Sequence, residues 1–130
     1  MKAIKQVYTI NAPLEKVWRS LVDPKIIKMW GGGSAVMDDK VGTKFSLWGG
    51  EIHGTNIKVV KNKELIQDWY GGPSDAGWEK PSKVTFKLSP RGGQTQVDLI
   101  HEDVPDSQVD DIEDGWKRYY LGPLKDFLEK

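Results

Sequence analysis

The sequence predicts an α+β domain in which a curved antiparallel sheet wraps a long C-terminal helix. Residues 105–130 carry apolar and aromatic side chains at every third or fourth position, which is the period of one helix face. The segments between residues 35 and 104 instead alternate polar and apolar side chains, and their short connections imply antiparallel neighbours. A helix this long needs a wide apolar surface, which a curved sheet supplies.

Composition favours one domain over residues 1–130 and excludes several classes of site. The 130 residues fit a single domain. Nineteen basic and nineteen acidic residues cancel, so nothing indicates a nucleic-acid partner. The chain has no cysteine, which removes disulfides and thiolate metal sites and agrees with an expected cytoplasmic location. No run approaches the roughly 20 apolar residues of a membrane span, and the N-terminus is too polar for a signal peptide.

The first 33 residues predict a strand and two short helices. Residues 2–10 alternate and indicate the strand. The Asn-Ala-Pro sequence at 11–13 opens a helix, because proline fits the first helical position. Asp23-Pro24 repeats this signal for a second helix, which is expected to end at Trp30, before three glycines.

The middle of the chain predicts six further strands. They are the segments 35–38, 44–47, 51–60, 64–70, 82–89 and 94–101. Gly49-Gly50 indicates a tight hairpin. Gly54 lies inside a strand and indicates a bulge or a close backbone approach, which leaves the register of strand 51–60 open. Trp78, in the irregular loop 71–81, either covers the entrance of a site or only pins the loop.

The last helix is expected to run from Pro105 to Lys130, with a kink near Gly122-Pro123. Proline cannot donate to the carbonyl one turn earlier and clashes with it. Trp116 and Tyr120 lie one turn apart on the apolar stripe, and they are either the wall of a cavity or ordinary core. The acidic start of the helix stabilises the positive end of its dipole, or alternatively docks a protein.

Several short motifs, in this order, resemble those of a known family. They lie at 12–18, 54–56, 66–69, 82–86 and 101–105, and the most specific is Gly-Trp-Lys-Arg-Tyr-Tyr at 115–120. Together they resemble the family named after the activator of heat shock protein 90 ATPase, specifically its C-terminal domain, within the START-like (SRPBCC) superfamily. The resemblance covers nearly the whole chain and implies a helix-grip fold, also called Bet v 1-like.

The resemblance implies two alternative functions. The wider superfamily mostly binds apolar ligands, which implies a non-enzymatic module holding a small apolar or amphipathic molecule between sheet and helix. The family name implies a chaperone-associated stress-response protein that contacts a heat-shock chaperone. The eukaryotic activator has an N-terminal domain that carries much of the chaperone contact, and this chain begins with the C-terminal-type domain. The family name alone therefore does not imply co-chaperone activity.

Eight residues are expected to line the ligand cavity, all on apolar faces of the predicted elements. They are Trp30, Phe45, Leu47, Phe86, Leu99, His101, Trp116 and Tyr120. Burial of the ligand's apolar surface would drive binding at about 25 cal/mol per Å², and His101 and the tyrosine hydroxyl would orient the ligand. His101 shares the parity of Val97 and Leu99, so it faces inward, as a ligand donor, a general base or a satisfied core histidine.

No catalytic, metal or cofactor site is expected. His53 and His101 lie on different strands, and metal-binding spacing such as H-E-x-x-H is absent. The glycine-rich segments 31–34 and 42–44 lack the residue order of a phosphate-binding loop. Because no nucleophile or acid–base pair is discernible, an enzyme is the least favoured of the three functions.

Overall fold

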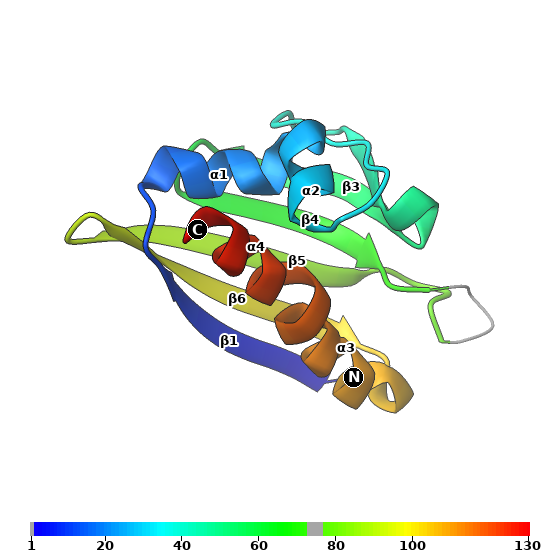
Figure 1. The fold of residues 1–130 in the computed structure, drawn as a ribbon. Helices are drawn as coiled ribbons and strands as arrows, with labels where there is room; N and C mark the ends of the chain where they lie inside the picture. The colour runs from blue at the N-terminus through cyan, green and yellow to red at the C-terminus, as the bar shows by residue number, and fades with distance from the viewer. Residues whose placement is uncertain (1, 73–76) are drawn as a thin grey trace.

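Within residues 2–72 and 77–130, which the computed structural model describes, six strands form one antiparallel sheet with helices across one face (Figure 1). The strands are β1 (Lys2–Ile10), β2 (Lys44–Leu47), β3 (Ile52–Val60), β4 (Glu64–Tyr70), β5 (Ser82–Arg91) and β6 (Gln94–Val104). The α-helices are α1 (Leu14–Val22), α2 (Pro24–Trp30), α3 (Val109–Gly115) and α4 (Leu121–Leu128). No helix in this described part is long and apolar enough to cross a membrane.

The strand order is β1-β6-β5-β4-β3-β2, so the first strand pairs with the last and β2 forms the opposite edge. Figure 1 shows α3 and α4 running in succession across the sheet, with α1 and α2 beside them. Burial alternates along β6, where Thr95, Val97, Leu99 and His101 all face the helices. The fold class predicted from the sequence, and the inward direction of His101, are therefore confirmed.

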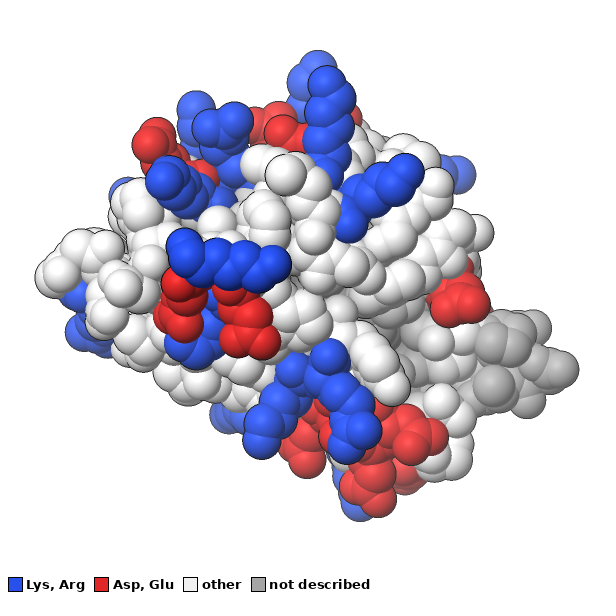
Figure 2. Space-filling model, in the orientation of Figure 1, with Lys and Arg blue, Asp and Glu red and all other residues white. Residues whose placement is uncertain are grey.

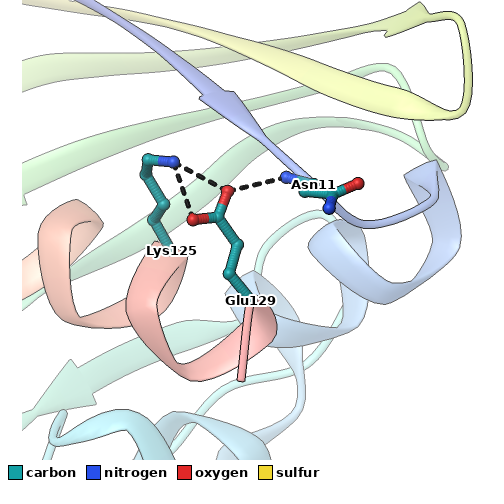
Figure 3. A network of polar contacts seen from close by, with 3 residues as sticks. All are labelled: Asn11, Lys125 and Glu129. Atoms are coloured by element: carbon teal, nitrogen blue, oxygen red, sulfur yellow. Dashed lines mark hydrogen bonds and ion pairs between the residues drawn. The ribbon is translucent and has the colours of Figure 1, made fainter.

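Both ends of the C-terminal helical segment are tied to the N-terminal strand. At its start, Gln6 Nε2 donates to the backbone carbonyl of Glu113 at 2.9 Å. At its end, the Glu129 carboxylate accepts from the backbone N–H of Asn11 at 2.8 Å and from Lys125 Nζ at 2.7 Å (Figure 3). These contacts fix the helical segment over the sheet at two points.

The predicted strand at 35–38 is wrong. Val36 forms only an isolated bridge, in which its N–H and C=O exchange 2.9 Å hydrogen bonds with Ser46. Directly after Val36 the backbone does not pair with a strand. Its carbonyls at Asp38 and Lys40 instead accept hydrogen bonds from the Asn56 side-chain Nδ2. Asn56 is buried on β3 and in turn accepts from Gln67. A side-chain anchor thus replaces the ladder at this edge.

The predicted last helix is present as one unbroken helical run, but its middle turn is not α-helical. A short 3-10 turn (Asp106–Gln108) precedes α3, and a π-helical segment, η4 (Trp116–Tyr120), separates α3 from α4. The N–H of Leu121 donates to the carbonyl of Trp116, five residues back. A Cβ at Gly122 would lie 1.9 Å from the carbonyl oxygen of Lys117, so only glycine permits this widened turn. The irregular turn therefore ends just before Gly122-Pro123, where a kink was expected.

The register of β3 is set by two separate features. A Cβ at Gly54 would lie 2.0 Å from the carbonyl oxygen of Asp68 on β4, so the expected close backbone approach is present. The register shift lies further along, between Asn56 and Lys58. His53 is exposed, and its ring stacks on that of Tyr70, with centroids 4.9 Å apart.

The tryptophan of the 71–81 loop is anchored. Trp78 is 2% exposed and packs edge-on against Trp69, with ring centroids 5.9 Å apart. Part of the predicted loop, residues 73–76, lies outside the described residues. The contact with Trp69 favours the interpretation that Trp78 pins the loop.

Candidate functional site

A pocket of about 350 Å³ opens between the C-terminal helical segment and the β3–β4 end of the sheet. From the helical side it is lined by Ile112, Gly115, Trp116, Tyr119 and Tyr120. From the sheet side it is lined by Trp48, Glu51, Ile52, Trp69 and Gly71. The volume lies within the range of about 300–1,000 Å³ typical of small-molecule sites.

Aromatic rings in mutual contact form most of the wall. Trp116 and Tyr120 have ring centroids 4.6 Å apart, one turn apart on the π-helical segment. Trp116 stacks on Trp69 of β4 at 5.4 Å. Tyr120 meets the edge of Trp48 at 6.0 Å. One helix, one strand and one turn therefore combine into a single aromatic surface.

Two of the eight sequence-predicted site residues, Trp116 and Tyr120, line this pocket. The other six are buried in the core: Trp30, Phe45, Leu47, Phe86, Leu99 and His101. Trp30 lies against Tyr120 at 5.0 Å, and Phe86 lies against Trp116 at 5.6 Å, so these two support the wall. Ligand contact at any of the eight residues stays a prediction.

His101 is joined to the pocket wall through a fully buried hydrogen-bond chain. Trp116 Nε1 donates to His101 Nδ1 at 3.0 Å. Because an indole N–H can only donate, Nδ1 must be the unprotonated nitrogen, and Nε2 carries the proton. His101 Nε2 then donates to Ser82 Oγ at 2.7 Å, and Ser82 donates to the carbonyl of Trp69 at 2.7 Å. Both ring nitrogens are occupied, which favours the satisfied core histidine over a ligand donor.

Burial also fixes the charge state of this histidine. Desolvation lowers the pKa of His101 from 6.5 to about 3, so the ring is neutral at physiological pH. A general base works best with a pKa near the operating pH. His101 therefore holds Trp116 in place rather than moving a proton.

Two polar groups of the wall have no hydrogen-bond partner among the described residues. Trp69 Nε1 is buried and has no hydrogen-bond acceptor in the described part of the protein. No hydrogen bond to the Tyr120 hydroxyl is found among residues 2–72 and 77–130 either, and burial raises its pKa above the ordinary value. Unsatisfied polar groups beside a pocket can be satisfied by water or by a ligand.

The residues that line the sheet side of the pocket were not among those predicted from the sequence. Trp48 follows a short strand and adopts a positive φ of 50° in a 3-10 turn (η1, Trp48–Gly50), so alternation does not place it. Its Nε1 donates to the carbonyl of Gly31 at 2.8 Å, which brings the α2–β2 connection to the pocket. Trp69 was detectable, because it shares the inward parity of Leu65 and Gln67 on β4.

The ionisable side chains do not gather into a metal site. In the described ranges, no group of three or more His, Cys, Asp or Glu residues is placed to hold a metal ion. Glu51 is the one carboxylate among the residues that line the pocket.

Residues 11–129 match the model of the family described as "Activator of Hsp90 ATPase homolog 1-like protein". The chain belongs to this family. It is 30% identical over 88 residues to the activator of 90 kDa heat shock protein ATPase homolog of Dictyostelium discoideum, covering 68% of this chain and 23% of the relative. It is 22% identical over 121 residues to the Hsp90 co-chaperone AHA1 of Saccharomyces cerevisiae, covering 90% of this chain and 35% of the relative.

The chain spans roughly a third or less of the curated relatives it matches, from 23% to 36% of their length. Among solved structures, an HSP90 activator from Plasmodium falciparum superposes with a TM-score of 0.87 at 23% identity, covering 98% of this chain and 96% of that one. This likeness shows the fold. The resemblance to the activator family and the helix-grip fold, both predicted from the sequence, are confirmed.

Proposed function

We propose that the protein is a non-enzymatic binding module that holds a small apolar or amphipathic molecule in the pocket between sheet and helix. The observation that carries this proposal is the aromatic wall formed by Trp48, Trp69, Trp116 and Tyr120 around about 350 Å³. Covering a ligand with this surface would contribute about 25 cal/mol per Å² of apolar area. The Tyr120 hydroxyl, for which no hydrogen bond is found among the described residues, supplies a polar contact that orients a ligand.

Direct contact with the ligand is assigned to Trp116 and Tyr120. Trp30, Phe86 and His101 hold these two rings from behind. The remaining predicted residues, Phe45, Leu47 and Leu99, would meet a ligand that extends deeper between helix and sheet. Catalysis is not proposed, because His101 has a pKa of about 3 and both of its nitrogens are occupied.

The test is native mass spectrometry of freshly purified protein, compared with the same sample after denaturation. We expect an extra mass that is lost on denaturation. Ile112→Trp should remove it, because Ile112 lines the pocket and the larger ring fills it. Val7→Trp is the matched control, since Val7 is 64% exposed and lies outside the pocket. Absence of any extra mass, or its persistence in Ile112→Trp, would count against the proposal.

The second candidate is a chaperone-associated protein, as the printed names of the relatives suggest. Charged side chains on the surface could contact a chaperone. Figure 2 shows lysine and arginine side chains gathered over α1 and α2, and aspartate and glutamate side chains near α3 with further lysine or arginine side chains beside them. A cytoplasmic location belongs to this candidate and stays a prediction.

A pull-down with the heat shock protein 90 of the same organism tests the chaperone candidate. If the acidic side of α3 docks, the double change Asp110→Asn and Asp111→Asn should reduce recovery of the chaperone. Asp126→Asn on α4 removes a comparable exposed charge elsewhere and should not. Lack of co-purification with the unaltered protein would count against this candidate.

A further inference from the structure

The described lining of the pocket combines aromatic rings with one negatively charged side chain. Five of its ten lining residues are aromatic: Trp48, Trp69, Trp116, Tyr119 and Tyr120. Glu51 is the charged residue among these ten, and within residues 2–72 and 77–130 no lysine, arginine or histidine belongs to the lining. From this combination we propose that the pocket selects organic cations, namely ligands that carry an alkyl- or arylammonium group. The inference rests on the proposed binding function and names its ligand class.

The rings that line the pocket lie at different angles to one another. Trp69 and Trp116 stack at 27° and 5.4 Å, whereas Trp48 meets Tyr120 at 72° and 6.0 Å. The wall therefore presents ring surfaces in different directions around one space. The face of an aromatic ring carries negative electrostatic potential, and a cation within about 6 Å of the centroid is attracted to it. An ammonium group held in the pocket would therefore be attracted by the aromatic rings that line it.

Glu51 adds an unneutralised carboxylate at the rim. It directly follows η1, where Trp48 is held by its hydrogen bond to Gly31, so its backbone position is fixed relative to the ring. No ion pair or hydrogen bond to its carboxylate is found in the described ranges. Its charge is thus available to a ligand rather than satisfied within the protein.

An anionic ligand would meet the opposite conditions. A carboxylate or phosphate is bound most strongly by basic side chains, and the charged side chain in the described lining of this pocket is Glu51. Like charges repel, and aromatic faces also disfavour an anion. The electrostatics of the pocket therefore distinguish cationic amphiphiles from fatty-acid-like ones of equal apolar area.

Two probe molecules of the same shape, one charged and one neutral, distinguish the contribution of charge to affinity from that of apolar burial. (3-Hydroxyphenyl)trimethylammonium and 3-tert-butylphenol differ in one atom, which is charged nitrogen in the first and neutral carbon in the second. Titrations near pH 6.5 would be followed through the indole N–H signals of the six tryptophans in NMR spectra. We expect shifts at Trp48, Trp69 and Trp116, and affinity for the cation about fivefold or more above that for the neutral probe.

Two glutamate variants complete the experiment. Glu51→Gln should weaken binding of the cation about threefold and leave the neutral probe unchanged. Glu113→Gln is the matched control, because Glu113 is exposed and lines a neighbouring groove with Gln6 and Tyr8 rather than this pocket. It should change neither affinity.

The outcomes separate this inference from the function on which it rests. Equal affinity for both probes at the same indoles would overturn the cation preference and leave the binding module intact. If Glu51→Gln and Glu113→Gln weakened binding of the cationic probe equally, the inference would also be overturned. The probe would then be attracted by the overall negative charge of this surface and not by Glu51 in particular. Failure of both probes to shift any pocket indole would overturn the inference and the binding function together.

Discussion

His101 links the sheet to the aromatic wall through two hydrogen bonds that require a neutral ring. Sequence parity was enough to place this residue inside, because alternation along β6 is regular. Its partners could not be predicted, since Ser82 and Trp116 come from elements 19 and 15 residues away in the chain. Protonation would replace the acceptor at Nδ1 by a donor facing the Trp116 N–H. The residue should therefore make folding pH-dependent.

The first prediction is a loss of stability in mild acid. The folded pKa of His101 is about 3, below the ordinary value of 6.5, so its stabilisation is complete above pH 6.5 and declines as the pH falls towards 3. Between pH 6.5 and 5 the free energy of unfolding should fall by about 2 kcal/mol from this group. Urea unfolding at both pH values measures it.

Two histidine variants check that this slope belongs to His101. His101→Gln keeps one acceptor and one donor but does not titrate, so its stability should change less between these pH values. His53→Gln alters the exposed histidine on β3 and should keep the slope of the unaltered protein. Identical slopes for all three proteins would show that another group is responsible.

At the scale of elements, the C-terminal helical segment shows what periodicity can and cannot predict. The 3.6-residue repeat correctly placed Trp116 and Tyr120 on the buried side. It could not predict the π-helical turn, because one inserted residue changes the backbone hydrogen bonds without erasing the apolar stripe. Gly122-Pro123 indicated a kink, but the close approach of Gly122 to the carbonyl of Lys117 could not be predicted from any sequence pattern.

The second prediction concerns the two glycines of this segment, which should respond in opposite directions to alanine. Glycine to alanine inside an ordinary helix stabilises by roughly 1 kcal/mol. Gly115→Ala should follow this rule, because a Cβ there meets nothing within 4 Å. Gly122→Ala should instead destabilise by about 2 kcal/mol or more, since its Cβ would lie 1.9 Å from the Lys117 carbonyl oxygen.

Thermal and urea unfolding of the two alanine variants decide this point. Amide hydrogen exchange should also show faster opening of η4 and α4 in Gly122→Ala alone. If both variants stabilised the protein, the close approach at Gly122 would not be needed for the fold.

At the scale of the whole molecule, the sheet and its helix were predictable, whereas the pocket was only partly so. Each predicted strand from 44 onwards carried its own pattern, and short connections determined their order. The pocket instead depends on three separate elements meeting: the turn at Trp48, the end of β4 and the π-helical segment. Trp48 reaches it through a hydrogen bond to Gly31, a long-range contact that leaves no local signal.

The third prediction follows from the way the helical segment is tied down at both ends. The Glu129 carboxylate accepts hydrogen bonds from Lys125 and from the backbone N–H of Asn11 (Figure 3). Both hydrogen bonds hold the pKa of this carboxyl below its ordinary value, and the one from Lys125 has the larger effect. Glu129→Gln removes the charge and should let the last turns of α4 open more often. Faster amide hydrogen exchange between residues 121 and 128 would report this opening.

The same change should leave the pocket end of the segment almost unaffected, because α3 has its own tie through Gln6 and the carbonyl of Glu113. Exchange at 109–115 and ligand-probe affinity should therefore stay as in the unaltered protein. Asp126→Asn is the matched control, since it removes an exposed carboxylate from α4 that is not part of the tie. Equal loosening of α3 and α4 in Glu129→Gln would show that the helical segment moves as one rigid unit over the sheet, and that the two ties do not act independently.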